Sequence, residues 1–143
     1  MIYTKQTKKA MRLAFEAHQG QLDKCGIPYV YHPLHLAEQM PDEDCTVAAL
    51  LHDVVEDTDY SLEDLRRMGF PPRALEAVAL LTHDPAEPYL DSVARVKQNP
   101  VARTVKLADL RHNSDLTRLD TVTERDLARV EKYAAALRLL EEQ

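Results

Sequence analysis

Tryptophan is absent from this chain, and cysteine and glycine are scarce, with two cysteines and three glycines in 143 residues. Two cysteines cannot form the disulfide framework of a small secreted domain. No apolar run approaches the roughly 18 residues that a membrane-spanning helix requires, and the amphipathic N-terminus does not look like a secretory signal. We therefore expect a protein of the reducing cytoplasm, with no membrane partner.

Positive charge is also scarce. Lysine and arginine total 18 against 24 aspartates and glutamates, so the formal net charge is −6. Non-specific binding to nucleic acid or to an anionic membrane needs a basic surface. The composition therefore predicts no nucleic-acid partner, although Lys106, Arg111 and Arg118 form a local group of cations in the sequence.

Strand patterns are missing too, because apolar residues recur at intervals of three and four rather than two. Capping residues or prolines mark helix starts over 61–64, at 71–72, at 99–100 and over 123–126. The pattern predicts one all-α domain over residues 1–143. Its first helix has the apolar positions Ala10, Met11, Ala14, Phe15 and Ala17, and its last helix has a core stripe of Leu127, Val130, Ala134, Leu137 and Leu140.

The stretch 48–58 predicts one helix with an unusual polar stripe. Apolar side chains cover most of the helical wheel, at about 100° per residue, and the polar ones share the remaining arc: His52, Asp53, Glu56 and Asp57. No lysine or arginine occurs between Asp42 and Arg66, although a solvated face usually mixes charges of both signs. Carboxylates at the edge of a core repel each other unless a cation joins them, which predicts a cleft with metal or proton chemistry. The alternative is an ordinary solvated acidic face beside a core histidine.

Two other segments supply further ligands. His32 precedes a proline at the start of an expected helix, where proline fits the first turn. Asp109 lies late in a helix opened by an Asn-Pro pair. With His52 and Asp53 they form a set of two imidazoles and two carboxylates, which suits Mn²⁺, Fe²⁺, Co²⁺ or Zn²⁺ rather than a structural thiolate zinc site.

Three separated motifs resemble those of the HD-domain hydrolases that degrade the alarmone ppGpp. They are a Tyr-x-x-His-Pro segment over 29–33, an H-D-x-x-E-D segment over 52–57 and a K-L-A-D-x-x-x-N segment over 106–113. The likeness covers about residues 5 to 140. The chain is similar in size to the stand-alone small alarmone hydrolases. The same module forms the hydrolase half of the long RelA/SpoT-type synthetase-hydrolases.

The resemblance implies a compact HD-domain helical bundle and a metal-dependent phosphohydrolase that releases pyrophosphate from the 3′ position of (p)ppGpp. It implies four ligands to Mn²⁺, which are His32, His52, Asp53 and Asp109. It implies that Glu56 and Asp57 handle protons at the attacking water and at the leaving group. It also implies contacts to a small phosphorylated nucleotide from Lys24, Asn113 and Tyr133.

The chain departs from the family pattern at positions that usually contact the substrate. Asp23 stands where the family usually has an arginine, and Pro85 stands where many relatives have a lysine. Each lost contact between a cation and a phosphate removes about 1.5 to 3 kcal/mol of attraction. The departures leave another substrate open, such as NADPH or a 3′-phosphonucleotide. A non-catalytic nucleotide-sensing module is a third possibility, although binding alone gives no reason to retain the acidic pair.

Some positions stay undecided on the sequence. His83 can partly replace the missing pocket lysine because its imidazole titrates near neutral pH, and His112 can reach the same side of its helix as Asp109. The length leaves no room for a separate synthetase domain, so we expect no synthetase activity. The sequence makes no prediction of the oligomeric state.

Overall fold

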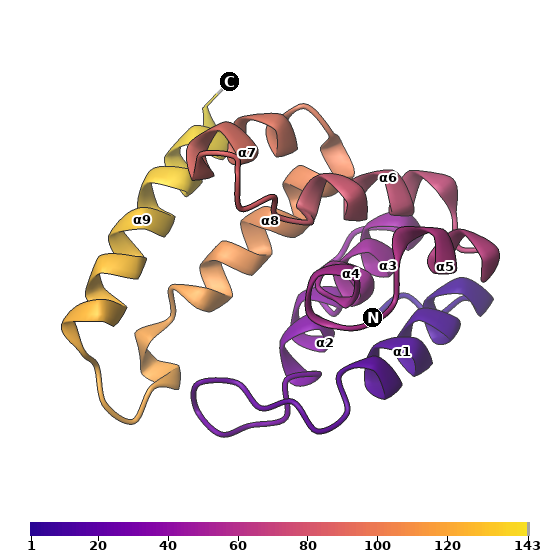
Figure 1. Ribbon diagram of the computed structural model, residues 1–143, viewed down its shortest axis with the longest axis horizontal. Coiled ribbons are helices and arrows are strands. Elements are labelled where there is room, and N and C mark those ends of the chain that lie inside the picture. Colours follow the sequence, from indigo (N-terminus) through magenta and orange to yellow (C-terminus); the bar gives the residue numbers. More distant parts are fainter. Residues whose placement is uncertain (143) are drawn as a thin grey trace.

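Helices account for the regular structure of residues 1–142, which are the residues that the computed structural model describes. The order along the chain (Figure 1) is α1 (Lys5–Ala17), α2 (Tyr31–Ala37), α3 (Glu43–Leu51), α4 (Val54–Asp57), α5 (Leu62–Arg67), α6 (Pro72–Leu81), α7 (Tyr89–Lys97), α8 (Pro100–Asn113), the 3₁₀ helix η1 (Leu116–Arg118) and α9 (Glu124–Glu141). The described residues contain no β-sheet, so the predicted all-α class is confirmed. None of these helices combines the length and the apolar character needed to cross a bilayer.

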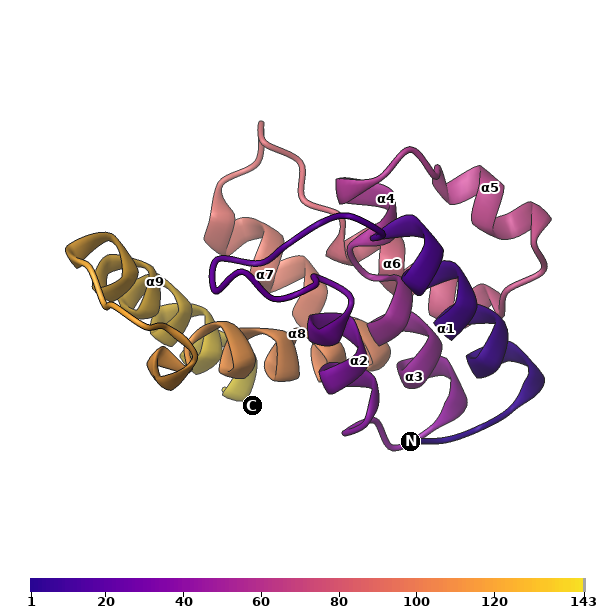
Figure 2. The same ribbon diagram turned by 90° about the horizontal axis from the view of Figure 1, so that it is seen from below.

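Helix α3 lies at the centre of the bundle. The carboxylate of Asp42 caps its first turn by accepting a hydrogen bond from the amide of Cys45, at 2.8 Å. Every residue from Cys45 to Leu51 is buried, because α3 packs against α1, α2, α6 and α8. In both views α9 lies at one side of the molecule and α1 at the other, with α8 between them (Figures 1 and 2).

The expected continuous helix over 48–58 is wrong, because the chain turns at His52 and Asp53 between α3 and α4. The ring nitrogen Nδ1 of His52 lies 2.6 Å from the carbonyl oxygen of Ala49. In an unbroken helix that carbonyl would accept from the amide of residue 53, so the imidazole competes with the helical ladder. Because of this break, His52 and the two acidic residues of α4 are not carried by one helix: His52 follows α3, and the acidic residues belong to the short helix α4.

The expected helix starts are confirmed. Ser61 and Thr123 each form a reciprocal capping box, and the side chain of Asn99 accepts from the amide of Ala102 at 3.0 Å. Pro33 lies in the first turn of α2, where its missing amide hydrogen costs no helical hydrogen bond. These local signals set where each site-bearing helix begins.

Two residues of the expected apolar stripes are not in the core. Phe15 is 60% exposed and Leu127 is 51% exposed. The buried part of α9 is its C-terminal half, with Ala136 and Leu140. Helical spacing identifies a shared face, but whether a neighbouring helix covers that face along its whole length is a tertiary property.

Two substitutions within α9 test this division of the helix. We expect Leu140→Ala to lower the free energy of unfolding by about 2 to 5 kcal/mol, because it removes fully buried methyl groups and leaves a cavity. Leu127→Ala removes the same atoms from an exposed position and should change it by no more than about 0.5 kcal/mol. Urea denaturation followed by circular dichroism measures both, and equal losses would contradict the assignment.

Candidate metal centre and adjoining pockets

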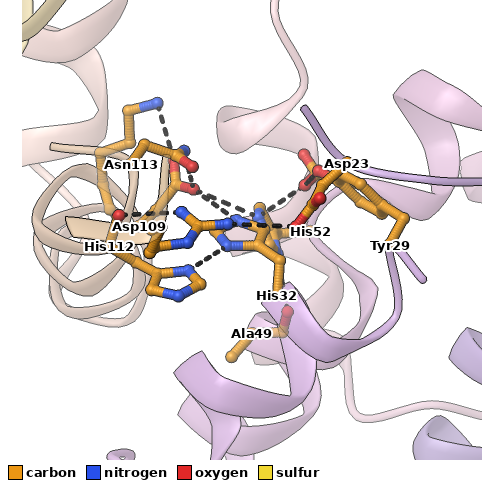
Figure 3. A network of polar contacts seen from close by, with 11 residues as sticks. Asp23, Tyr29, His32, Ala49, His52, Asp109, His112 and Asn113 are labelled. Carbon is orange, nitrogen blue, oxygen red and sulfur yellow. Dashed lines mark hydrogen bonds and ion pairs between the residues drawn. The ribbon is translucent and has the colours of Figure 1, made fainter. Parts of the chain in front are cut away.

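Three helices bring together the buried side chains of the candidate metal centre. His32 comes from the first turn of α2, His52 follows α3, and Asp109 comes from the last part of α8. All three are at least nine-tenths buried. The oxygen Oδ1 of Asp109 lies 2.9 Å from Nε2 of His32 and 3.7 Å from Nε2 of His52 (Figure 3). Residues far apart in the sequence thus present two imidazole nitrogens to one carboxylate.

Asp53 connects this centre to the acidic residues of α4. Its Oδ2 lies 2.9 Å from Nε2 of His52 and also accepts a hydrogen bond from the hydroxyl of Tyr29. One carboxylate oxygen from each of Asp53, Glu56 and Asp57 falls within 4.8 Å of the others. The four predicted ligands and the predicted acidic pair therefore occupy one continuous region.

The buried charges of the centre depend on each other. Burial disfavours the charged form of His52, but the carboxylates of Asp53 and Asp109 raise its pKa well above the ordinary value. Burial likewise disfavours ionised Asp109, but hydrogen bonding to His32 and His52 and the nearby ammonium of Lys106 hold its pKa well below the ordinary value. The pocket thus favours ionised carboxylates, which are the form that binds a cation, and a bound cation would displace the proton that these carboxylates favour on His52.

The donor set fits a divalent metal ion. Nδ1 of His52 is directed at the carbonyl of Ala49, which leaves Nε2 facing the carboxylates. That Nε2 atom is buried and makes no well-directed hydrogen bond within residues 1–142. A ligating histidine ordinarily engages its other ring nitrogen in this way, which fixes the tautomer. Imidazole and carboxylate donors together suit a divalent transition metal.

The two acidic residues of α4 have different surroundings. Burial, together with the negative charges of Asp53 and Glu56, raises the pKa of Asp57 to about 6. The side chain of Glu56 instead accepts a hydrogen bond from the amide of His83, at 2.6 Å. Glu56 therefore also holds the loop between α6 and α7 beside the centre. Asp57 has a pKa close to neutral pH.

A cavity of about 280 Å³ adjoins the metal centre, on the side of the loop between α1 and α2. His32 and Tyr29 form part of its wall, so the cavity reaches the centre directly. Lys24 and Asn113, two predicted substrate contacts, also line it. Much of the remaining wall is apolar and consists of Leu22, Leu116, Leu119 and Val130.

Asp23, the unexpected acid of this pocket, organises the loop that carries it. Its Oδ1 accepts hydrogen bonds from the amides of Cys25 and Ile27, at 2.8 and 3.0 Å. Its Oδ2 forms an ion pair with Arg118, at 3.4 Å. A guanidinium therefore stands at this wall of the cavity, but η1 supplies it rather than position 23.

A second cavity of about 210 Å³ lies on the other side of Asp109. Tyr133, the third predicted substrate contact, lines it with Lys106 and Lys132. Lys106 pairs with Asp109 at 3.3 Å. Asn113 lines both cavities and donates from Nδ2 to Oδ1 of Asp109 at 3.0 Å. His83 borders this second cavity, while Pro85 is not among its lining residues.

Two residues of this region were not assigned to it from the sequence. Tyr29 belongs to the Tyr-x-x-His-Pro segment, but the sequence gives it no role at the site, and its hydroxyl contacts Asp53. Its position three residues before His32 is the one available signal. The sequence does not decide the role of His112, and its Nδ1 lies 2.7 Å from Nδ1 of His32. Burial, and then the charge of Arg118, lowers the pKa of His112 to about 4, so its imidazole is neutral near pH 7.

Known proteins resemble this chain in sequence and in fold. The chain is 37% identical over 121 residues to a GTP pyrophosphokinase of Streptomyces coelicolor, covering 76% of this chain and 14% of that protein. It is 32% identical over 119 residues to a guanosine-3′,5′-bis(diphosphate) 3′-pyrophosphohydrolase of Aquifex aeolicus, covering 75% of this chain and 17% of that protein. The chain thus spans less than a fifth of the length of these curated relatives.

A solved structure matches over nearly the full chain. It is that of a metazoan ortholog of SpoT described as hydrolysing ppGpp, with a TM-score of 0.76, 26% sequence identity and coverage of 99% of this chain and 88% of that one. The family model described as HD domain matches residues 10–111, a range that contains all four predicted metal ligands. Because this match extends over well more than half of the sequence, the chain belongs to the HD domain family.

Proposed function

We propose that this protein is a metal-dependent phosphohydrolase that removes the 3′-pyrophosphate of (p)ppGpp. The observation that carries the proposal is the buried group of His32, His52 and Asp109, which Asp53 connects to the acidic pair, between two cavities. The printed functions of the Aquifex relative and of the metazoan SpoT ortholog support the choice of substrate. In the proposed reaction, water attacks the phosphorus bound to the 3′ oxygen, which gives GDP and pyrophosphate from ppGpp.

His32, His52, Asp53 and Asp109 would hold one divalent cation, which we propose to be Mn²⁺. When bound, such an ion neutralises phosphate charge and lowers the pKa of a coordinated water. Tyr29 orients Asp53 through its hydroxyl, and the carbonyl of Ala49 orients His52. Both contacts would fix the orientation of these two side chains before the substrate binds.

Asp57 is the proposed proton carrier. A carboxyl group with a pKa near 6 can accept a proton from the attacking water and return it to the departing 3′ oxygen near neutral pH. After burial and the charge of Asp53, the negative charge of Glu56 also raises this pKa. Through His83, Glu56 also fixes the loop that closes one side of the site.

The two cavities suggest how a nucleotide is held. The 280 Å³ cavity, with its leucine and valine wall, suits a nucleoside, while Lys24 and Arg118 stand at its polar side. The second cavity brings Lys106, Lys132 and Tyr133 to the other side of Asp109, where they would contact phosphate oxygens. Asn113 lines both cavities and would contact the sugar between them.

Another phosphorylated nucleotide, such as NADPH or a 3′-phosphonucleotide, is a second candidate substrate. The observation that favours it is the Asp23–Arg118 ion pair, which places a carboxylate where relatives of this type carry a cation. The same proton and metal chemistry would apply. A non-catalytic sensing role would leave the elevated pKa of Asp57 without a purpose. We place the reaction in the cytoplasm, where both cysteines stay reduced.

A product screen tests the proposed function. We expect the Mn²⁺-loaded protein to convert ppGpp to GDP and pyrophosphate, with a kcat/KM at least about tenfold above that for NADPH, since the pocket contacts differ between the two ligands. Ion-exchange chromatography of the products measures this, with pppGpp and 3′-phosphorylated adenosine in parallel. Release of phosphate from NADPH without turnover of ppGpp would establish the second candidate instead.

The metal ligands are tested by removal of the carboxylate that both histidines face. Asp109→Ala should lose the bound ion, because it leaves His32 and His52 without their shared anionic neighbour. Metal analysis after gel filtration measures the occupancy, and Asp91→Ala on the exposed face of α7 is the matched control. Equal occupancy in the wild-type and Asp109→Ala proteins would exclude this ligand set.

The acidic pair is tested by isosteric amides. Glu56→Gln keeps an acceptor for the amide of His83, so its effect reports the lost charge. We expect Glu56→Gln and Asp57→Asn each to lower kcat by about 10²- to 10⁴-fold while metal content is retained. The double variant should lose far less than the product of the two effects, because the residues act as one unit. Full turnover of Asp57→Asn would refute the proton-carrier assignment, and the exposed Asp59→Asn serves as control.

A further inference from the structure

His112 is in direct contact with a proposed metal ligand but has no role in the reaction described above. Its Nδ1 lies 2.7 Å from Nδ1 of His32, on the side of the His32 ring away from Asp109 (Figure 3). The residue is the penultimate one of α8, three positions after Asp109. One helix therefore supplies both a carboxylate on one side of the His32 ring and an imidazole on the other.

The geometry of the two rings is that of a hydrogen bond in the ring plane. The ring planes differ by 7°, and the centroids are 5.0 Å apart. A nitrogen-to-nitrogen distance of 2.7 Å plus the two ring radii accounts for the whole centroid separation. The rings are therefore joined edge to edge, so the lone pair of one nitrogen points along the N–H bond of the other.

The direction of this hydrogen bond follows from the other nitrogen of His32. Nε2 of His32 faces Oδ1 of Asp109 and the proposed metal position, so a metal-binding His32 carries its ring proton on Nδ1. That N–H donates, and Nδ1 of His112 accepts. His112 must then carry its own single proton on Nε2.

The protein holds His112 in place for this contact. The carbonyl oxygen of His112 accepts a hydrogen bond from Nη1 of Arg118, at 2.9 Å. On its other side the ring lies against His35, with centroids 4.2 Å apart. Because Arg118 also pairs with Asp23, the end of α8 is tied to the loop between α1 and α2. The acceptor is thus fixed by both its backbone and its ring.

We propose that His112 is a positioning residue, which accepts the Nδ1–H of His32 and thereby fixes the tautomer and ring plane in which Nε2 of His32 binds the metal. The inference rests on the proposed metal site. Removing such an outer partner typically weakens metal affinity by about 10- to 100-fold. The role requires an acceptor at the place of Nδ1 and does not require an imidazole as such.

Two substitutions distinguish the role of the hydrogen-bond acceptor of His112 from that of its aromatic ring. His112→Phe keeps a ring of similar shape but has no acceptor. His112→Asn loses the ring but keeps an oxygen attached to Cγ, where Nδ1 is attached in histidine. We expect His112→Phe to weaken Mn²⁺ binding by about 10- to 100-fold and His112→Asn to restore most of that loss. Arg111→Gln is the matched control on the same helix, because this exposed side chain pairs with Glu141 and contacts neither ring, and its affinity should equal that of the wild type.

Competition with a chelator measures the Mn²⁺ affinity, and the visible spectrum of the Co²⁺-loaded proteins reports the ligand geometry. Thermal unfolding of the metal-free variants shows whether they are folded. Equal Mn²⁺ affinity for His112→Phe and wild type would overturn the inference, as would His112→Asn binding no better than a folded His112→Phe. Failure of the wild-type protein itself to bind Mn²⁺ or Co²⁺ would instead remove the proposed metal site and the inference with it.

A measurement on the unaltered protein is independent of whether the variants fold. Long-range ¹H–¹⁵N spectra of the histidine rings identify which nitrogen carries the proton, and Zn²⁺ serves as a diamagnetic probe for the metal. We expect a proton on Nδ1 of His32 and none on Nδ1 of His112 in the Zn²⁺-loaded protein. A proton on Nδ1 of His112 would overturn the inference.

Discussion

The contact between Asp109 and the two imidazoles of His32 and His52 is the constraint on which the rest of the structure depends. A buried carboxylate is tolerated only beside groups that compensate its charge. Those groups come from α2 and from the end of α3. Helix α8 therefore has to pack against both helices at the position of Asp109. The apolar residues of α3 fill the surrounding volume and exclude water. The core and the site are therefore parts of the same packing arrangement.

The turn after α3 shows how local chemistry serves this arrangement. An unbroken helix would have spread His52 and the acidic residues along a single rigid stripe. The ring of His52 contacts the carbonyl of Ala49, and α4 begins as a separate helix at Val54. Asp57 therefore lies at the edge of the buried centre. One side chain thus both ends a helix and presents its remaining nitrogen to the carboxylates.

The sequence was sufficient for features that depend on neighbours a few positions away. The caps at Ser61, Asn99 and Thr123, and the turn that begins α2, follow from short-range hydrogen bonding. The proposed ligand residues were predicted from motifs that resemble those of a family, and the structure brings these side chains together. Periodicity misled at Phe15, since a regular apolar face need not have a covering partner.

Contacts between distant segments could not be read from the sequence. Tyr29 meets Asp53 across 24 positions and His112 meets His32 across 80, and nothing in the intervening residues encodes either pairing. Asp23 gave the opposite difficulty. Its charge looked unsuitable for a pocket expected to bind phosphates, because its partner Arg118 lies 95 positions away.

That ion pair has a consequence for how this pocket can diversify. Asp23 holds its loop through two amides and holds the end of α8 through Arg118. Reversal of either charge places like charges side by side in the wall of the cavity, and reversal at position 23 also removes the acceptor of the two loop amides. A change of charge at one of these positions therefore requires a compensating change at the other. Positions 23 and 118 should covary among near relatives of this chain.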